Sequence, residues 1–148
     1  MKAMQRTASA VTAALVFATA GTALGEDAAP LPQEQAQGSV RYLTGGVGTD
    51  EAKAVQKEMP RYPLALEFVG KTRPKNEFLA DVAVTITDRD GRVVLDTVSE
   101  GPFLLVKLDP GKYRIAAVQN GETKNRSVEV SAKGSKRVTF EWKADADA

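Results

Sequence analysis

Histidine and cysteine are both absent from the 148-residue chain. Histidine is the commonest general base in enzymes, and these two residue types are the usual protein ligands of zinc. Their absence excludes Ser-His-Asp and Cys-His nucleophilic sites, and it excludes zinc sites built from these ligands. Paired carboxylates are then the main remaining route to catalysis. Without cysteine there is no disulfide, so stability has to come from a hydrophobic core.

Long apolar runs are also lacking. The longest, residues 10–20 ("AVTAALVFATA"), is too short to cross a bilayer, which takes roughly 20 residues. Lys2 and Arg6 precede this run and small residues follow it up to Gly25, which is the order typical of a secretory signal peptide. We therefore predict a signal peptide over residues 1–25, with cleavage after Gly25 or about five residues earlier. A periplasmic protein without stable membrane insertion is expected.

The chain has no excess of charge of either sign. It contains 20 basic and 19 acidic residues, and removal of Lys2 and Arg6 would leave 18 basic residues and a net charge of −1. Domains that bind nucleic acid usually carry a basic patch that supplies much of the affinity. Nucleic acid is therefore not an expected partner. The roughly 120 remaining residues fit one domain.

Both ends of the predicted mature chain are polar. Residues 26–39 are acidic and rich in Pro, Gln and Ala, which predicts a flexible leader. Residues 144–148, "ADADA", predict a disordered acidic tail. The folded domain is expected over residues 40–143.

Alternation of apolar and polar residues predicts eight β-strands in this domain. They cover residues 40–44, 62–69, 80–88, 92–98, 103–108, 112–119, 125–131 and 136–142. Turn chemistry separates several of them, at Gly91, at Pro110 with Gly111, and at Asn120 with Gly121. Strands do not alternate with helices, so a parallel nucleotide-binding sheet is excluded. The fold class predicted is mainly β, an antiparallel seven- or eight-stranded sandwich of the Greek-key kind.

A glycine-rich stretch, "TGGVGTDE" at residues 44–51, raises the question of a phosphate site. A phosphate-binding loop needs a lysine and a hydroxyl residue at fixed positions after its glycines, and these are missing. Asp50 and Glu51 would repel a phosphate at the helix N-terminus, although they suit the helix dipole. We expect Gly45, Gly46 and Gly48 to form a turn. The alternative is a binding loop that presents the two acidic residues to a partner or a cation.

A short helix should follow this turn. Thr49 is expected to be its N-cap, because a threonine hydroxyl can accept a bond from a free backbone N–H. Ala52, Val55 and Met59 lie at helical spacing and form one apolar stripe. Pro60 should end the helix. The helix is expected to lie on the sandwich as a single amphipathic element.

Two other features are weaker indications of binding. The basic loop at residues 70–76, "GKTRPKN", is expected to be a solvated hairpin end, with contact to an anionic ligand as the alternative. Trp142, Tyr42 and Tyr62 are expected to lie in the core. If exposed together, they would form a platform for carbohydrate instead.

Residues 81–115 resemble the carboxypeptidase regulatory-like, or prealbumin-like, β-sandwich repeat. The matching features are an alternating strand, the Gly91 turn, Gly101 with Phe103, the Leu-Asp-Pro-Gly turn and the Tyr113 strand that follows. The front segment "YLTGGVGTDE" is similar to that of small exported proteobacterial proteins with this domain. The resemblance implies a Greek-key-like sandwich in an accessory, non-catalytic module, because the family shares no catalytic residues.

The function expected is therefore a non-catalytic periplasmic binding or accessory protein of the cell envelope, with no cofactor and no metal. Its partner would be an envelope protein or a glycan. One alternative is a structural or stress-protective envelope protein without a specific ligand. Another is a carboxylate-dependent glycan hydrolase, which needs two carboxylates roughly 5–10 Å apart in a cleft.

Overall fold

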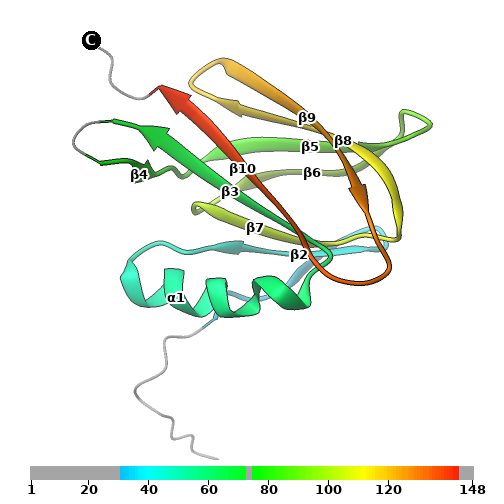
Figure 1. Cartoon of the computed structure of the whole chain (residues 1–148), viewed down its shortest axis with the longest axis horizontal. Helices are drawn as coiled ribbons and strands as arrows, with labels where there is room; N and C mark the ends of the chain where they lie inside the picture. Colours follow the sequence, from blue (N-terminus) through cyan, green and yellow to red (C-terminus); the bar gives the residue numbers. More distant parts are fainter. Residues whose placement is uncertain (1–30, 73–74, 144–148) are drawn as a thin grey trace, which may run out of the picture.

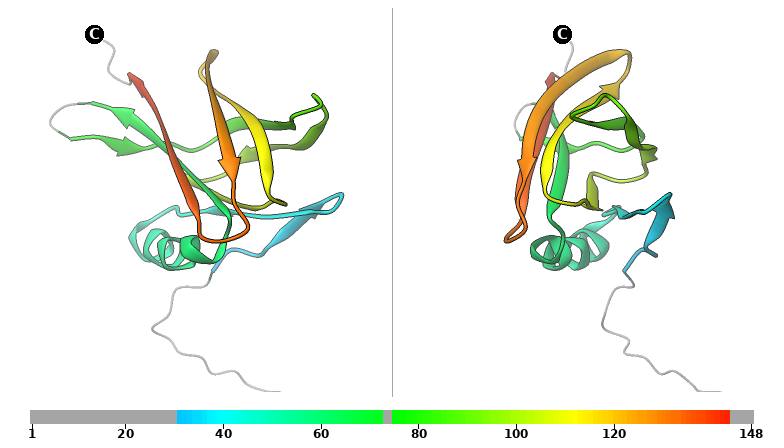
Figure 2. Two further views of the ribbon diagram at one scale, coloured as in Figure 1. Left: turned by 45° about the vertical axis from the view of Figure 1, so that its right-hand side comes forward. Right: turned by 90° about the vertical axis from the view of Figure 1, so that its right-hand side faces the viewer.

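Two β-sheets packed face to face make up the protein, as the computed structural model shows for residues 31–72 and 75–143 (Figures 1 and 2). The six-stranded sheet contains β1 (Gln35–Gln37), β2 (Val40–Gly45), β7 (Phe103–Lys107), β3 (Leu64–Lys71) and β10 (Lys136–Lys143) in that order, with β4 (Glu77–Phe78) beside β3. The four-stranded sheet contains β6 (Val93–Ser99), β5 (Val82–Asp88), β8 (Gly111–Gln119) and β9 (Glu122–Val130). The predicted mainly-β sandwich is confirmed.

All eight predicted strands are present, and two short strands, β1 and β4, add to them. Neighbouring strands are antiparallel except for β3 and β10, which pair in parallel from Leu64 with Lys136 to Lys71 with Lys143. The prediction of an antiparallel sandwich was therefore wrong at this pair. Alternation along a strand reports which face is buried, but it carries no information about the direction of the neighbouring strand.

Part of the leader expected to be flexible is a β-strand. Residues 35–37 form β1, which pairs antiparallel with β2, so the expectation was wrong for this part of residues 26–39. Its residues are mostly polar and show no alternation of apolar and polar side chains that would predict a strand. Pairing with β2 holds this segment in place. The predicted signal peptide and acidic tail lie outside the described residues.

The main core fills the space between the two sheets. Aromatic side chains of β3 and β10 meet there, with Phe68 5.8 Å from Phe140 and 6.3 Å from Trp142 between ring centroids. Trp142 is 3% exposed and donates its indole N–H to the carbonyl of Glu122 in the other sheet. The two sheets are thus joined by apolar burial and by a satisfied polar contact.

A second core lies under the helix α1 (Thr49–Glu58), on the outer face of the six-stranded sheet (Figure 1). Ala52, Val55 and Met59 pack there against Leu43 and Phe103, so the predicted apolar stripe is confirmed. Because the helix covers this face, β7 is buried on both sides for most of its length.

The start of the helix differs from the prediction. Gly48 is the N-cap, without a side-chain cap bond, and Thr49 is already the first helical residue. The expected Thr49 cap was therefore wrong, because Gly48 reaches the backbone conformation that turns the chain into the helix. The α-helix ends at Glu58, and a 3-10 turn over Met59–Arg61 contains Pro60.

The predicted turns are found where the sequence placed them. Asn120 and Gly121 have φ of 50° and 80° and form the two-residue hairpin between β8 and β9. At the Gly91 turn, the Asp88 side chain accepts bonds from the backbone N–H groups of Asp90 and Arg92. The Tyr113 hydroxyl donates to the carbonyl of Asp109 at 2.8 Å and thereby braces the Pro110–Gly111 turn.

Candidate functional site

The glycine turn leads from β2 into α1 and is tightly packed. A side chain at Gly45 would collide with Pro32, and one at Gly46 would collide with Phe103. Gly48 faces open space, but its φ of 86° favours glycine. Packing and backbone conformation therefore account for the three glycines.

The carboxylate of Glu51 reaches back into this turn. It accepts hydrogen bonds from the backbone N–H of Gly46 at 3.2 Å and from that of Val47 at 2.8 Å. These N–H groups are the kind of donors that a bound phosphate would need at a helix N-terminus. The protein's own carboxylate occupies them, so the turn is not shaped as a phosphate cradle. Asp50, the other predicted acidic residue, is exposed to solvent.

A groove of about 510 Å³ lies between the glycine turn and the segment around β4. Val47 forms one side and is 62% exposed, while Phe78 forms the other and is 50% exposed. The Phe78 ring stands 5.3 Å from the buried Phe103 ring, which supports it from below. Lys53 and Gln56 of α1 add a polar margin. The groove thus joins an apolar floor to a partly polar rim.

One wall of this groove also carries backbone groups that point away from β3. The backbone N–H of Leu79 donates to the carbonyl of Phe68, and Phe78 lies opposite Val69 in the same antiparallel pair. Backbone groups of successive residues in such a pair point to opposite sides. The N–H and C=O of Phe78 therefore point away from β3. Because β10 occupies the other edge of β3, that side is the one nearer β2 and the glycine turn.

The glycine turn and the groove gather the predicted binding residues in one region, but sequence reasoning missed Phe78. The pattern around it is too short to signal a strand, and its exposure depends on residues far away in the chain. Of the five predicted residues, Gly46 and Gly48 line the groove. Gly45 and Glu51 support the turn from behind.

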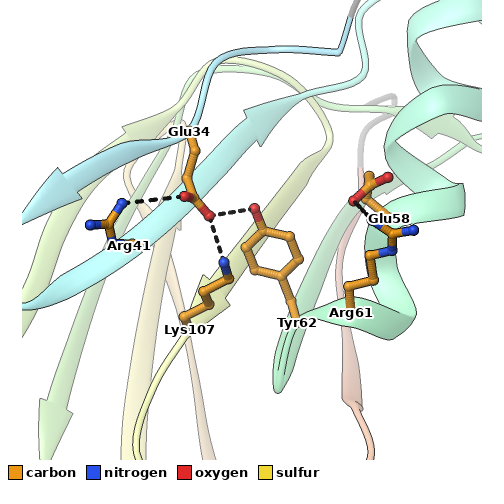
Figure 3. A network of polar contacts seen from close by, with 6 residues as sticks. All are labelled: Glu34, Arg41, Glu58, Arg61, Tyr62 and Lys107. Carbon is orange, nitrogen blue, oxygen red and sulfur yellow. Dashed lines mark hydrogen bonds and ion pairs between the residues drawn. The ribbon is translucent and has the colours of Figure 1, made fainter.

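A polar network fastens the N-terminal segment beside the helix (Figure 3). The Glu34 carboxylate accepts a hydrogen bond from the Tyr62 hydroxyl at 2.7 Å and lies 3.1 Å from the Lys107 ammonium. It also lies 3.6 Å from the Arg41 guanidinium. The Lys107 ammonium stands 5.1 Å above the Tyr62 ring centroid as well. One carboxylate thereby joins the leader to β2, β7 and the chain after α1.

The network changes the pKa of the Glu34 carboxyl and of the Tyr62 phenol. The hydrogen bonds from Tyr62 and then Lys107 hold the pKa of Glu34 below its usual value, because they favour the charged carboxylate. Burial, and then the bond to Glu34, raise the pKa of the Tyr62 phenol. Both shifts favour an ionised Glu34 that accepts from a protonated Tyr62.

Several weaker candidates can now be placed. Trp142, Tyr42 and Tyr62 are 3%, 6% and 5% exposed, so they lie in the core as expected and do not form a carbohydrate platform. Within residues 31–72 and 75–143, no group of three acidic side chains could hold a metal ion. The same part of the chain has no helix long and apolar enough to span a membrane. The basic loop at residues 70–76 falls partly outside the described residues.

Comparisons with known proteins leave the family open. No protein-family model matches the chain, and no curated protein matches it. A crystal structure of S.CueP resembles it in part, with a TM-score of 0.40 and 17% sequence identity over 51% of this chain and 59% of that chain. The matched part is thus less than two thirds of that chain, and a likeness at this level identifies neither a family nor a function. The carboxypeptidase regulatory-like resemblance stays a prediction.

Proposed function

We propose that this protein is a non-catalytic binding module of the cell envelope that holds an extended, apolar peptide segment of a partner protein. The observation that carries the proposal is the groove between the glycine turn and β4, which two exposed large apolar side chains, Val47 and Phe78, line together. Exposed apolar side chains that gather in a concave site are typical of binding surfaces.

The backbone of Phe78 favours an extended occupant. Its N–H and C=O point away from β3, so a peptide lying in the groove could pair with them as an added strand. Alternate side chains of such a peptide would then contact the Phe78 ring and Val47. Main-chain pairing would give affinity, and the apolar contacts would give selectivity.

The groove is also prepared for binding before a partner arrives. Glu51 holds the turn from inside, Pro32 packs against Gly45, and Phe103 lies under both walls. A rigid site loses little conformational freedom when it binds, and this preserves affinity.

The compartment and the class are proposed on the sequence. The predicted signal peptide supports a periplasmic location, and the carboxypeptidase regulatory-like resemblance supports an accessory role. A structural envelope protein without a ligand would not need a preformed apolar groove. A carboxylate-dependent hydrolase is less supported, because no acidic side chain lines this groove.

The test uses a fluorescent ten-residue peptide of alternating valine and threonine, with lysine at both ends for solubility. We expect saturable binding by fluorescence anisotropy, and the double variant Val47→Ser/Phe78→Ser should weaken it at least tenfold, because burial of each apolar side chain contributes roughly 1.5–3 kcal/mol when complete. Val93→Ser/Val98→Ser removes two other exposed apolar side chains and should leave affinity unchanged. The proposal would be contradicted if the parent chain did not bind the peptide saturably, or if the two double variants bound it with equal affinity.

A further inference from the structure

The outer face of the four-stranded sheet carries a second hollow that the proposed peptide site does not involve. The helix covers the other sheet, and none of its residues packs on this one. The hollow has a volume of about 540 Å³ and lies over β5, β8 and β9 near the Gly91 turn. Its polar lining includes Thr87, Arg89, Lys112, Arg114, Ser127 and Glu129.

The strand register places Arg114 between two hydroxyl residues. Arg114 of β8 lies opposite Thr87 of β5 on one side and opposite Ser127 of β9 on the other. Residues opposite each other in a sheet project from the same face, and Ile115, the next residue of β8, is fully buried in the core. The guanidinium and the two hydroxyls therefore rise together from the outer face.

Basic residues outnumber acidic ones in the lining of this hollow by three to two. Arg89, Lys112 and Arg114 all line it, and none of them takes part in the five ion pairs found in the described part of the chain. Asp88 also lines the hollow, but its carboxylate accepts two backbone N–H bonds of the Gly91 turn. Glu129 is the other acid among the lining residues and lies opposite Lys112 in the strand register, which leaves the lining a net charge of +1.

We propose that this hollow binds an anionic saccharide, a sugar that carries a phosphate or carboxylate group. Arg114 would hold the anionic group, since a guanidinium forms paired hydrogen bonds with planar or tetrahedral oxyanions, and Lys112 and Arg89 would add charge. The hollow is much larger than a single oxyanion. Thr87, Ser127 and Glu129 supply the donors and acceptors that sugar hydroxyl groups need. The inference does not rest on the peptide groove and stands or falls separately.

The experiment titrates the mature chain with glucose 6-phosphate and, in a second arm, with galacturonate, and follows backbone amide signals by NMR. At least one probe should bind saturably and shift signals of β8 and β9, and the two arms identify the anionic group. Arg114→Gln should lower its affinity at least tenfold. Arg114→Lys, which keeps the charge but loses the paired donors, should lower affinity less.

Three controls decide the outcome. Lys57→Gln removes an equal charge from the exposed face of α1 and should leave affinity unchanged. Glucose and inorganic phosphate should each bind at least tenfold more weakly than the charged sugar that binds. No saturable binding of either probe, unchanged affinity in Arg114→Gln, or equal binding of inorganic phosphate would overturn the proposal.

Discussion

Single side chains hold the glycine turn and its surroundings in place. Thr44 and Ser99 are the two buried polar side chains of the described core, and their hydroxyl oxygens lie 2.9 Å apart. Thr44 also accepts the backbone N–H of Glu100, and a side chain at Gly101 would collide with the backbone of Gly45. The chain between β6 and β7 therefore packs directly against the start of the turn, with its polar groups satisfied.

Glu51 is the residue on which the turn depends most directly. Glu51→Ala should remove both acceptor contacts and raise amide hydrogen exchange at Gly46 and Val47 roughly tenfold or more, because hydrogen bonds to charged groups contribute about 1.5–3 kcal/mol. Glu51→Gln keeps a neutral acceptor and should have a smaller effect. Asp50→Asn, at the exposed neighbouring position, serves as the control. Unchanged exchange in Glu51→Ala would show that backbone packing alone holds the turn.

At the scale of elements, the N-terminal segment protects an edge of the other sheet. The Gln37 side chain accepts the backbone N–H of Asp96 at 2.8 Å and donates to its carbonyl at 3.0 Å. Asp96 lies on β6, an edge strand that also carries the exposed side chains of Val93 and Val98. An unprotected edge of this kind can pair with another chain, so Gln37 acts as a substitute for a neighbouring strand.

We expect Gln37→Ala to promote self-association through β6. The change leaves the Asp96 backbone groups without their side-chain partner, and stability should fall by about 1 kcal/mol. Sedimentation velocity over a range of protein concentrations measures the association. Gln33→Ala removes a glutamine from the same segment at an exposed position and should remain as monomeric as the parent chain. Equal behaviour of the two variants would argue against protection of this edge by Gln37.

For the whole molecule, the Glu34 network couples stability to pH. The contacts of Glu34 lower its pKa in the folded state, so its contribution to stability is present above the pKa of the unfolded chain, near 4.5. That contribution is lost as the pH falls through the lower, folded-state pKa. The contacts that join the leader to β2, β7 and the chain after α1 should therefore weaken in acid, and the free energy of unfolding should fall with them.

Glu34→Gln tests this coupling. At pH 7 the variant should be less stable by about 1 kcal/mol, the magnitude usual for a partly exposed ion pair. As the pH falls below about 4.5, the difference from the parent chain should shrink, because the parent's carboxylate becomes protonated. Urea unfolding at pH 7 and at acidic pH measures both differences. Glu100→Gln removes an exposed carboxylate outside the network, and a pH dependence as strong as that of Glu34→Gln would refute the assignment.

Much of the architecture follows from local pattern, because burial in a sandwich alternates with every residue. The eight main strands, the Asn120–Gly121 hairpin and the apolar stripe at Val55 of the helix could all be located in this way. β1 and β4 could not be predicted in this way. With three and two residues, they are too short to show a period, and pairing with β2 and β3 places them.

The sequence by itself determined the mainly-β class, the helix after the glycines and the lack of histidine and cysteine chemistry. Those properties depend on residue type and on spacing between near neighbours. Only the tertiary structure decided the parallel pairing of β10 with β3, the return of Glu51 into the turn and the placement of Val47 and Phe78 in one groove. Each of these brings together residues from different segments, and their positions depend on how the chain crosses between the sheets and turns at its glycines. The physical reason is that local propensity describes how a segment folds, whereas a binding surface depends on which distant segments are packed beside it.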